Sequence, residues 1–388
     1  MAKNTPIEWT DHSWPVLNGC RRKSEGCRNC YAERLIATRL RHTAKYKGLA
    51  VYTEGGPRWT GESRLWLPDL TMPIKLGKPS RIFVADMGDL FFEGNSNEEI
   101  ATVFAVMAAC PQHTFQVLTK RPERAAEWFK WVQNQHGGEG TLHARVTCYL
   151  SAVRAERVAE LDRFRDALRP PWPEGGKWPL PNVHLGVSAE DQATYNERVP
   201  TLVHKCPAEA HWVSLEPQLG PIELRGTGHI HLAWVVQGGE SGPGARPFDI
   251  EWARSMRDEC AESGISYFLK QLGGNHFAPW NVQWVDGHKE GSIEAVFFNH
   301  KGIRSELATV WPNGVWHTWD ARGTGGENSQ EPTVELAKSA ALDALQRQHV
   351  TPVKGWSRHV HMLRNRKGNA MSEWPEDLRI RQFPEARA

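Results

Sequence analysis

Six short apolar runs, separated by stretches long enough for a helix, mark the middle of the chain. Continuous apolar runs of this length predict parallel strands that are buried on both faces. The runs are Arg81–Ala85, Thr114–Thr119, Val183–Val187, His211–Leu215, Leu232–Gln237 and Ser266–Leu269. Helical patterns follow near Asn97–Cys110, Pro122–Trp131, Tyr195–His204 and Glu251–Ser263. With a first strand near Ile7–Trp14, the chain contains about seven strand–helix units.

This alternation predicts an α/β protein. A full or partial (β/α) barrel is our first choice, and an open doubly wound sheet is the alternative. In both architectures the chemistry gathers at the carboxyl ends of the strands, and here polar residues recur at these ends. They are Cys20, Cys27, Cys30, Asp86, Asp89, Lys120, Arg121, Ser188, Glu190, Glu216, Gly239, Glu240 and Lys270.

Two stretches interrupt the rhythm and divide the chain. Residues 134–181 predict a helical insertion in a barrel that spans residues 1–273. Residues 274–355 are rich in tryptophan and alternate around Ala295–Thr318, which predicts a small β-rich insertion. Residues 356–388 form a basic C-terminal segment that is expected to return to the barrel.

The composition gives little indication of a binding partner, but it argues against a membrane protein or a secreted one. The 47 Lys and Arg against 45 Asp and Glu give a net charge of +2, so a nucleic acid would have to meet a local basic patch. The longest apolar run, Val103–Cys110, is far shorter than the roughly 18 residues that cross a bilayer. The N-terminal residues lack the apolar stretch of a secretion signal. We therefore expect a cytoplasmic protein with no membrane partner.

Three of the seven cysteines lie within eleven residues, as Cys20, Cys27 and Cys30. Three thiolates suit either an iron–sulfur cluster or zinc. A structural zinc site normally has four ligands, and no fourth Cys or His follows at zinc-finger spacing. Three thiolates on a four-iron cluster instead leave one iron open for a substrate or cofactor. The pattern favours a cluster, with zinc and unligated thiols as alternatives.

The cysteine motif also resembles a known family. Gly19-Cys20 and Gly26-Cys27-Arg28-Asn29-Cys30-Tyr31-Ala32 are similar to the three-Cys motif of the phage Gp37/Gp68 family. Further matches lie at 187–192, 214–217, 238–242, 270–273 and 374–384. The resemblance implies a radical S-adenosylmethionine (SAM) type barrel with a [4Fe-4S] cluster, distantly similar to spore photoproduct lyase. If the chain is phage-encoded, its expected location is the host cytoplasm.

The chain departs from the usual radical SAM pattern in three respects. Its cysteines are spaced by six and then two residues instead of three and then two, and Asn29 replaces the usual aromatic residue before the last cysteine. Gly238-Gly239-Glu240 follows about the sixth strand, whereas the family's SAM-binding Gly-Gly-Glu follows the second. Asp86 or Asp89 is therefore the better candidate for binding the SAM amine.

The other candidate residues each have a competing structural interpretation. Ser188 and Glu190 could bind ribose hydroxyls, although they could equally cap a helix, as could Asp86 and Asp89. Gly238 and Gly239 could let the backbone approach the cofactor, or simply form a tight turn.

The candidate catalytic residues are Glu216, Glu240 and Lys270. Glu216 precedes a proline, which favours an extended backbone and could aim its carboxylate into the barrel. Lys120 and Lys270 could pair with a substrate carboxylate or phosphate, or with Glu216 and Glu240 in structural ion pairs.

A basic C-terminal stretch is a candidate for nucleic-acid binding, with a solvated basic face as the alternative. Its candidate residues are Lys354, Trp356, Arg358, Arg364 and Arg366. We expect a radical SAM enzyme that receives electrons from a flavodoxin or ferredoxin, with a DNA base as the leading candidate substrate. One rival is a zinc-stabilised nucleic-acid-binding or nuclease-accessory protein. A second rival uses the cluster structurally or as a redox sensor.

Overall fold

A computed structural model describes most of the chain. The described residues are 5–135, 147–151, 178–224, 231–242, 244–273, 283–288, 291–298, 304–318, 327–350 and 376–384. The chain forms two compact units. The first comprises residues 1–237, 255–270 and 381–388, and the second comprises residues 238–254 and 271–380. Of the predicted helical insertion at 134–181, residues 136–146 and 152–177 lie outside the described residues.

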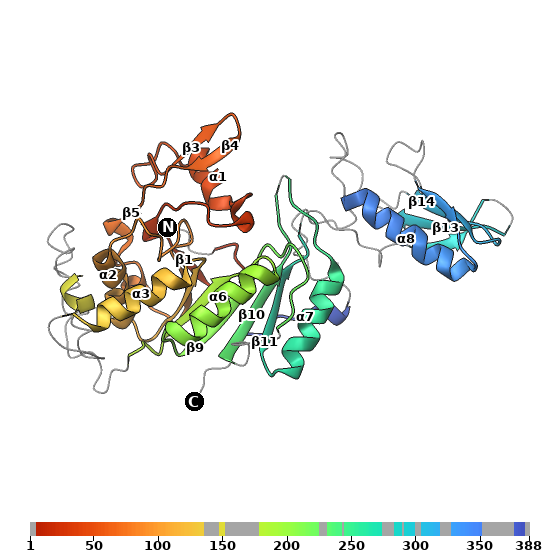
Figure 1. Ribbon diagram of the computed structural model, residues 1–388. Coiled ribbons are helices and arrows are strands. Elements are labelled where there is room, and N and C mark those ends of the chain that lie inside the picture. Colours follow the sequence, from red (N-terminus) through yellow and green to blue (C-terminus); the bar gives the residue numbers. More distant parts are fainter. Residues whose placement is uncertain are drawn as a thin grey trace. The chain divides into compact units, whose positions relative to one another are not determined.

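A curled sheet of seven strands is the centre of the fold (Figure 1). Its strands are β1 (His12–Trp14), β6 (Arg81–Val84), β7 (Thr114–Thr119), β8 (Val183–Ser188), β9 (Ala210–Leu215), β10 (Leu232–Gly238) and β11 (Ser266–Gln271). They lie side by side in chain order, and the pairs from β1 to β10 are parallel. A doubly wound sheet requires a reversal of strand order, which is absent from this sheet. The architecture is therefore a partial (β/α) barrel.

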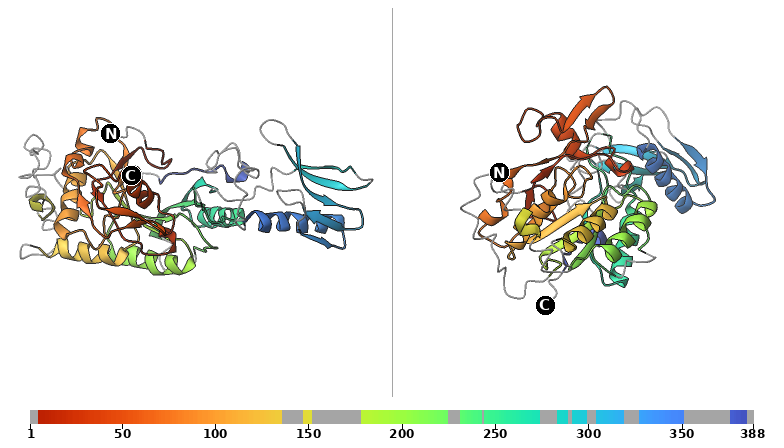
Figure 2. Two further views of the ribbon diagram at one scale, coloured as in Figure 1. Left: turned by 90° about the horizontal axis from the view of Figure 1, so that it is seen from above. Right: turned by 60° about the vertical axis from the view of Figure 1, so that its left-hand side comes forward.

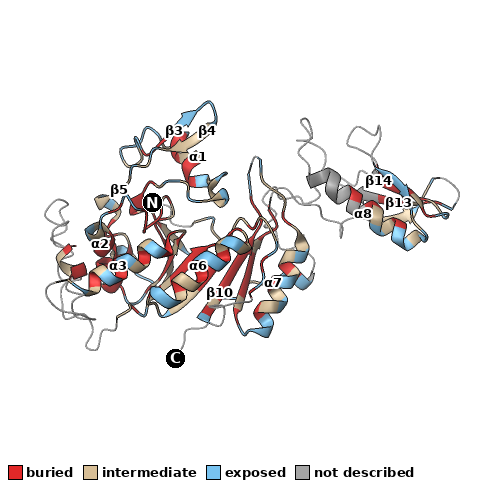
Figure 3. Ribbon diagram, viewed as in Figure 1, coloured by how far each residue is buried: buried red, intermediate tan, exposed pale blue. Residues whose placement is uncertain are grey.

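Helices follow the strands and cover the outer face of the sheet (Figures 1 and 2). They are α2 (Asn97–Ala108), α3 (Pro122–Gln133), α6 (Gln192–Lys205) and α7 (Ile250–Glu262). The short helix α1 (Tyr31–Ala37) packs instead against two antiparallel strands, Ala50–Thr53 and Gly56–Trp59. Ser96 begins α2 and Asp191 begins α6, each in a capping box, and Pro122 is the first residue of α3. The strands of this sheet are buried along most of their length, whereas the helices are buried mainly on the side that faces the sheet (Figure 3). The six apolar runs and the four helical patterns are thus confirmed.

The predicted first strand, Ile7–Trp14, is too long. Only His12–Trp14 is a strand, because the amide of Thr10 donates to the carbonyl of Ile7 and closes a turn. This turn places Trp9 among the buried side chains on the inner face of the sheet.

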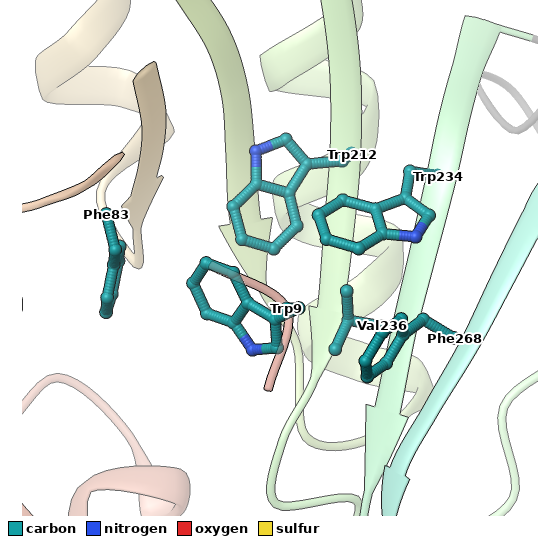
Figure 4. Close-up of a cluster of buried hydrophobic side chains, with 6 residues drawn as sticks. All are labelled: Trp9, Phe83, Trp212, Trp234, Val236 and Phe268. Atoms are coloured by element: carbon teal, nitrogen blue, oxygen red, sulfur yellow. The ribbon is translucent and has the colours of Figure 1, made fainter. Parts of the chain in front are cut away.

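An aromatic cluster fills the inside of the curled sheet (Figure 4). It consists of Trp9, Phe83, Trp212, Trp234, Val236 and Phe268. The ring centroids of Trp9 lie 5.4 Å from Trp212 and 6.1 Å from Trp234. The neighbouring strand carries Gly186 at this level, where a Cβ would lie 2.4 Å from the indole of Trp212. The inner face of this partial barrel is therefore covered by a tryptophan-rich core.

Polar side chains succeed the aromatic ones toward the carboxyl ends of the strands. Side chains on a strand alternate between faces, so residues two apart share a face. Trp212 is followed on the inner face of β9 by Ser214 and, just beyond the strand, by Glu216. Phe268 is followed on β11 by Lys270. The inner face thus changes from an apolar plug to a polar layer at the edge where chemistry is expected.

Short elements surround this edge. Two antiparallel pairs, β2 (Leu17–Asn18) with β5 (Arg64–Leu65) and β3 (Ala50–Thr53) with β4 (Gly56–Trp59), were not predicted from the sequence. Among the described residues of the first unit, 3-10 helices at Glu25–Cys27, Leu67–Asp69 and Pro73–Lys75 accompany them. Another described 3-10 helix, Glu376–Leu378, belongs to the second unit.

The C-terminal residues run along β11. Arg381 forms a β-bridge with Phe268, and the amide of Gln382 donates to the carbonyl of Tyr267. Phe383 lies 5.3 Å from Phe268, between ring centroids, and the guanidinium of Arg81 lies 4.0 Å from the centroid of Phe383. This segment extends the aromatic cluster of the first unit.

The second unit contains a five-stranded antiparallel sheet where the sequence predicts a β-rich insertion. The strands are β12 (Gln283–Asp286), β13 (Ile293–Phe298), β14 (Arg304–Val310), β15 (Val315–Thr318) and β16 (Asn328–Gln330). Helix α8 (Val334–Val350) packs on β14 and β15 with three buried alanines, Ala337, Ala341 and Ala344. Within the part of the chain that the structure describes, no helix is both long and apolar enough to cross a membrane.

Candidate functional site

The three clustered cysteines lie on one loop, residues 19–30, which we term the cysteine loop. Its start is fixed to the end of β6, because the amide of Gly19 donates to the carbonyl of Met87 at 3.1 Å. Gly19 and Gly88 form a parallel bridge, and a Cβ on Gly88 would lie 2.8 Å from the carbonyl oxygen of Gly19. Glycine is therefore required at position 88 for the loop to approach the sheet this closely.

Two arginines hold the middle of the loop. The guanidinium of Arg22 donates from Nε to Oε2 of Glu33 at 3.0 Å, and Glu33 on α1 is 1% exposed. Arg121, at the start of α3, donates from Nη2 to the carbonyl of Arg21 at 2.7 Å. The cysteine loop is thus tied to the first helix and to the sheet by buried, charge-assisted hydrogen bonds.

All three thiols are free and partly buried. Cys27 ends a short 3-10 helix, and the amide of Cys30 donates to the carbonyl of Cys27 at 3.3 Å just before α1 begins. Burial raises the pKa of the Cys30 thiol to about 11, and the neighbouring Cys27 adds to the increase. Burial likewise raises the pKa of Cys20, as do Asp89 and the other two thiols. The three sulfur atoms therefore lie within electrostatic range of one another.

Three thiols on one loop are a donor set that zinc and iron–sulfur clusters both use. Among the described residues, no three His, Cys, Asp or Glu side chains converge closely enough to hold one metal ion. A [4Fe-4S] cluster makes a different demand, because each thiolate binds a separate iron. Cys20, Cys27 and Cys30 would be its ligands.

Asp89 is saturated by donors from the protein itself. Its carboxylate accepts from the hydroxyl of Thr119 at 2.7 Å, from the amide of Lys120 at 3.1 Å and from the amide of Phe91 at 3.0 Å. Nη1 of Arg121 is a fourth donor at 3.0 Å. Asp89 caps no helix, since Ser96 begins α2. Its contacts make it an anchor for the strand ends.

Asp86, three residues earlier, has a different environment. The preceding Ala85 has a φ of 57°, a left-handed conformation that is costly for a residue with a Cβ and that clusters at functional sites. Burial raises the pKa of the Asp86 carboxyl to about 7, although Lys45 and Ser13 oppose the increase. Its Oδ1 is buried and has no hydrogen-bond partner in the described part of the chain. The hydroxyl of Tyr31 donates to the Asp86 carbonyl.

Glu190 is a buried carboxylate directly beneath the cysteine loop. It is 1% exposed and accepts from Nζ of Lys120 at 3.3 Å and from Nη1 of Arg198 at 3.1 Å. Burial acts to raise the pKa of Glu190, but Lys120, the hydroxyl of Ser24 and Arg198 together lower it. A Cβ on Gly26 would lie 2.9 Å from Oε2 of Glu190. Its Oε1 is buried without a partner among the described residues.

Ser188 precedes this carboxylate on the same strand. Its carbonyl accepts from Nη1 of Arg198 at 2.8 Å, and the residue is 6% exposed. Neither Ser188 nor Glu190 caps α6, because Asp191 does so. The alternative interpretation of these two residues as a helix cap is therefore wrong.

Glu216 and Lys270 form an ion pair on the inner face of the sheet. Oε1 of Glu216 lies 2.9 Å from Nζ of Lys270, and the side chains are 14% and 21% exposed. The pair joins the ends of β9 and β11. Partly exposed ion pairs of this kind can exchange partners with a bound polar ligand at small cost.

The remaining candidates lie in the second unit or outside the described residues. Glu240 accepts from both Nε and Nη2 of Arg246, at 2.9 and 2.6 Å. Gly238 ends β10, and a Cβ on Gly239 would lie 2.5 Å from the carbonyl oxygen of Leu272. Gly239 therefore permits close packing of the chain against itself. The five basic-segment residues (Lys354, Trp356, Arg358, Arg364 and Arg366) lie outside the described part of the chain.

Three contributors were missed at the sequence level. Arg198 was hidden because it lies inside a helix, eight residues beyond the carboxylate that it contacts. Tyr31 directly follows the last cysteine, which was a usable signal. The need for glycine at position 26 arises from its contact with Glu190, which only the folded chain creates.

No curated protein and no solved structure matches the chain. A family model matches residues 4–347, which include the cysteine loop and every strand of the curled sheet. The chain therefore belongs to DUF5131, a family of proteins of unknown function.

Proposed function

We propose that the protein is a radical SAM enzyme whose [4Fe-4S] cluster is held by Cys20, Cys27 and Cys30. The observation that carries the proposal is the position of these three free thiols. They lie on one anchored loop at the carboxyl-terminal edge of a curled parallel sheet. Binding sites of (β/α) barrels lie at this edge.

When bound, the cluster would supply one electron, drawn from a flavodoxin or ferredoxin, that cleaves SAM into methionine and a 5′-deoxyadenosyl radical, which takes a hydrogen atom from the substrate. The chain's own residues would bind and orient the reactants. Their arrangement around the cysteine loop suggests a separate role for each.

Asp86 is the residue that we assign to the SAM amine. Its buried Oδ1 lacks a partner among the described residues, whereas four donors already occupy Asp89. A buried acceptor without a partner is costly, so a ligand that donates to it is stabilised. An ammonium group would also hold the Asp86 carboxylate in its ionised form.

Glu190 and Ser188 are the residues that we assign to hydroxyl groups of the ligand. Oε1 of Glu190 is the second buried carboxylate oxygen without a partner among the described residues near the loop. Lys120 and Arg198 keep this carboxylate ionised, and therefore able to accept a hydrogen bond. Gly26 leaves room for it to remain under the cysteine loop.

Glu216 and Lys270 would act on the substrate. Their ion pair faces the inside of the sheet and is partly exposed, so a polar substrate could displace either partner. We keep a DNA base as the leading candidate substrate. Such a base would have to leave the stack to reach this edge.

Metal analysis tests the proposal. The protein is purified without oxygen, and iron, acid-labile sulfide and zinc are measured in the wild type and in Cys20→Ala, Cys27→Ala and Cys30→Ala. Cys206→Ala is the matched control, because Cys206 is buried far from the loop in sequence. About four iron and four sulfide per chain, lost in the three loop variants only, would support the proposal. About one zinc per chain and no iron would refute it.

A further inference from the structure

Positive charge is concentrated in one continuous stretch of the chain. Residues 20–64, which we term the basic arm, contain eleven Lys and Arg against four Asp and Glu, a net charge of +7. The whole chain carries +2, so the remainder has a net charge of −5. The basic arm comprises most of the cysteine loop, α1 and the β3–β4 ribbon, all within the first unit.

Most of this charge is at the surface. Two cations of the arm have acidic partners, Arg22 with Glu33 and Lys45 with Asp69. Six other cations are exposed. They are Arg21, Lys23, Arg28, Arg39, Arg41 and Lys47. An unusually basic surface on an otherwise acidic protein attracts polyanions.

The surface is also hollowed at the cysteine loop. An open depression of about 610 Å³ is lined by Arg22, Lys23, Ser24, Glu25 and Arg28. Three of these five residues are cationic and one is acidic. Such a depression can accommodate a phosphate group between guanidinium and ammonium donors.

The β3–β4 ribbon projects beside α1 (Figure 1). Its base is fixed, since Ala50 packs in one buried cluster with Ala32 and Ile36 of α1. Its outer part is exposed to solvent, with Val51 47% exposed and Tyr52 64% exposed. A two-stranded ribbon fits the major groove of DNA, and an exposed aromatic ring can contact bases.

We propose that the basic arm is a docking surface for double-stranded DNA, in which the β3–β4 ribbon enters a groove while the exposed cations around it contact phosphates. This inference deepens the proposed function by locating the surface that presents the DNA substrate, and it rests on that function for the choice of DNA. The surface includes most of the cysteine loop, so docked DNA lies next to the edge assigned to the chemistry.

Fluorescence anisotropy with a short labelled DNA duplex tests the inference. The test variant of the full chain is Arg39→Gln/Arg41→Gln/Lys47→Gln, which leaves the cysteine loop intact. The matched control is Lys78→Gln/Lys130→Gln/Lys205→Gln, which removes the same charge from exposed positions outside the arm. We expect the test variant to bind about tenfold more weakly or worse, and its salt slope to fall by about 2 to 3. The control should bind within about twofold of the wild type.

Tyr52→Ala is an independent test of the same inference. Loss of this ring should weaken duplex binding without changing the salt slope, because no charge is removed. Equal weakening in the test and control variants would overturn the inference. Stronger binding of a single strand than of the duplex would exclude the groove-bound ribbon.

Two further measurements separate the alternatives. Polyglutamate that competes as well as DNA at equal charge would indicate an acidic protein partner and overturn the inference. Iron content is measured on the same samples. Full iron loading with unchanged DNA binding would refute the docking surface and leave the proposed function standing.

Discussion

Arg121 and Asp89 form a buried ion pair beneath the cysteine loop. Nη1 of Arg121 lies 3.0 Å from Oδ2 of Asp89, and the side chains are 3% and 7% exposed. The same guanidinium also donates to the carbonyl of Arg21. The pair therefore fixes the position of the cysteine loop relative to the ends of β6 and β7.

Removing the carboxylate of this pair should be costly. We expect Asp89→Asn to lower the free energy of unfolding by about 3 kcal/mol, because the buried guanidinium of Arg121 then keeps only Glu93, whose side chain is 56% exposed, as a counter-charge. Asp11→Asn is the matched control, since the Asp11–Arg81 pair is 43% and 33% exposed and should cost about 1 kcal/mol or less. Urea unfolding measures both. Equal losses would show that the buried pair has no special role.

Gly26→Ala should displace the cysteine loop. Its Cβ would lie 2.9 Å from Oε2 of Glu190, and this carboxylate cannot move freely because Lys120 and Arg198 hold it. We expect a clear loss of bound iron per chain, with the helical content unchanged by circular dichroism. Gly77→Ala is the control, because a Cβ there meets nothing within 4 Å. Normal iron content in Gly26→Ala would contradict the close contact.

Asp86 should make stability depend on pH. Burial raises the pKa of its carboxyl from 3.8 to about 7 in the folded chain. Between these values the folded chain retains a proton that the unfolded chain has released, so stability falls as the pH rises through this window. Asp86→Asn removes this contribution.

The difference between the wild type and Asp86→Asn isolates the effect. Buried His184 and His211 have lowered pKa values and give an opposite slope below about pH 6.5, but they are present in both proteins. We expect the wild type to lose stability relative to Asp86→Asn as the pH rises from about 5 to about 8. Urea unfolding across this range supplies the curves, and a constant difference would rule out the raised pKa.

The aromatic cluster predicts a compensating pair of substitutions. A Cβ at Gly186 would lie 2.4 Å from the indole of Trp212, so Gly186→Ala should cost about 1 to 3 kcal/mol through overpacking. In a Trp212→Phe background the smaller ring leaves space, and the same substitution should cost less. A double-mutant cycle measures this coupling. Strict additivity would mean that the two residues do not compete for the same volume.

The sequence predicted the local elements well and the long-range contacts poorly. Thr114–Thr119 became a strand with unchanged boundaries, and the other apolar runs differ from their strands by one or two residues at one end, because a buried parallel strand imposes its own apolar pattern. The cysteine spacing likewise marked one loop. Spacing cannot show that Asp89 is saturated while Asp86 is not, since that difference depends on Thr119 and Arg121, some 30 residues away.

The β3–β4 ribbon was missed for a related reason. Its strands are short and its outer side chains, such as Tyr52, are exposed, so no alternation of apolar and polar residues marks it. Its position is fixed by Ala50 against α1, a contact that only the folded chain creates.

Electron paramagnetic resonance of the dithionite-reduced, anaerobically purified protein, recorded with and without SAM, tests the central claim most directly. We predict the signal of a reduced [4Fe-4S] cluster that changes when SAM is added, because three thiolates leave one iron open. The change should be lost or weakened in Asp86→Asn and retained in Asp11→Asn. A cluster signal that SAM does not alter would contradict the account, as would the absence of any cluster signal.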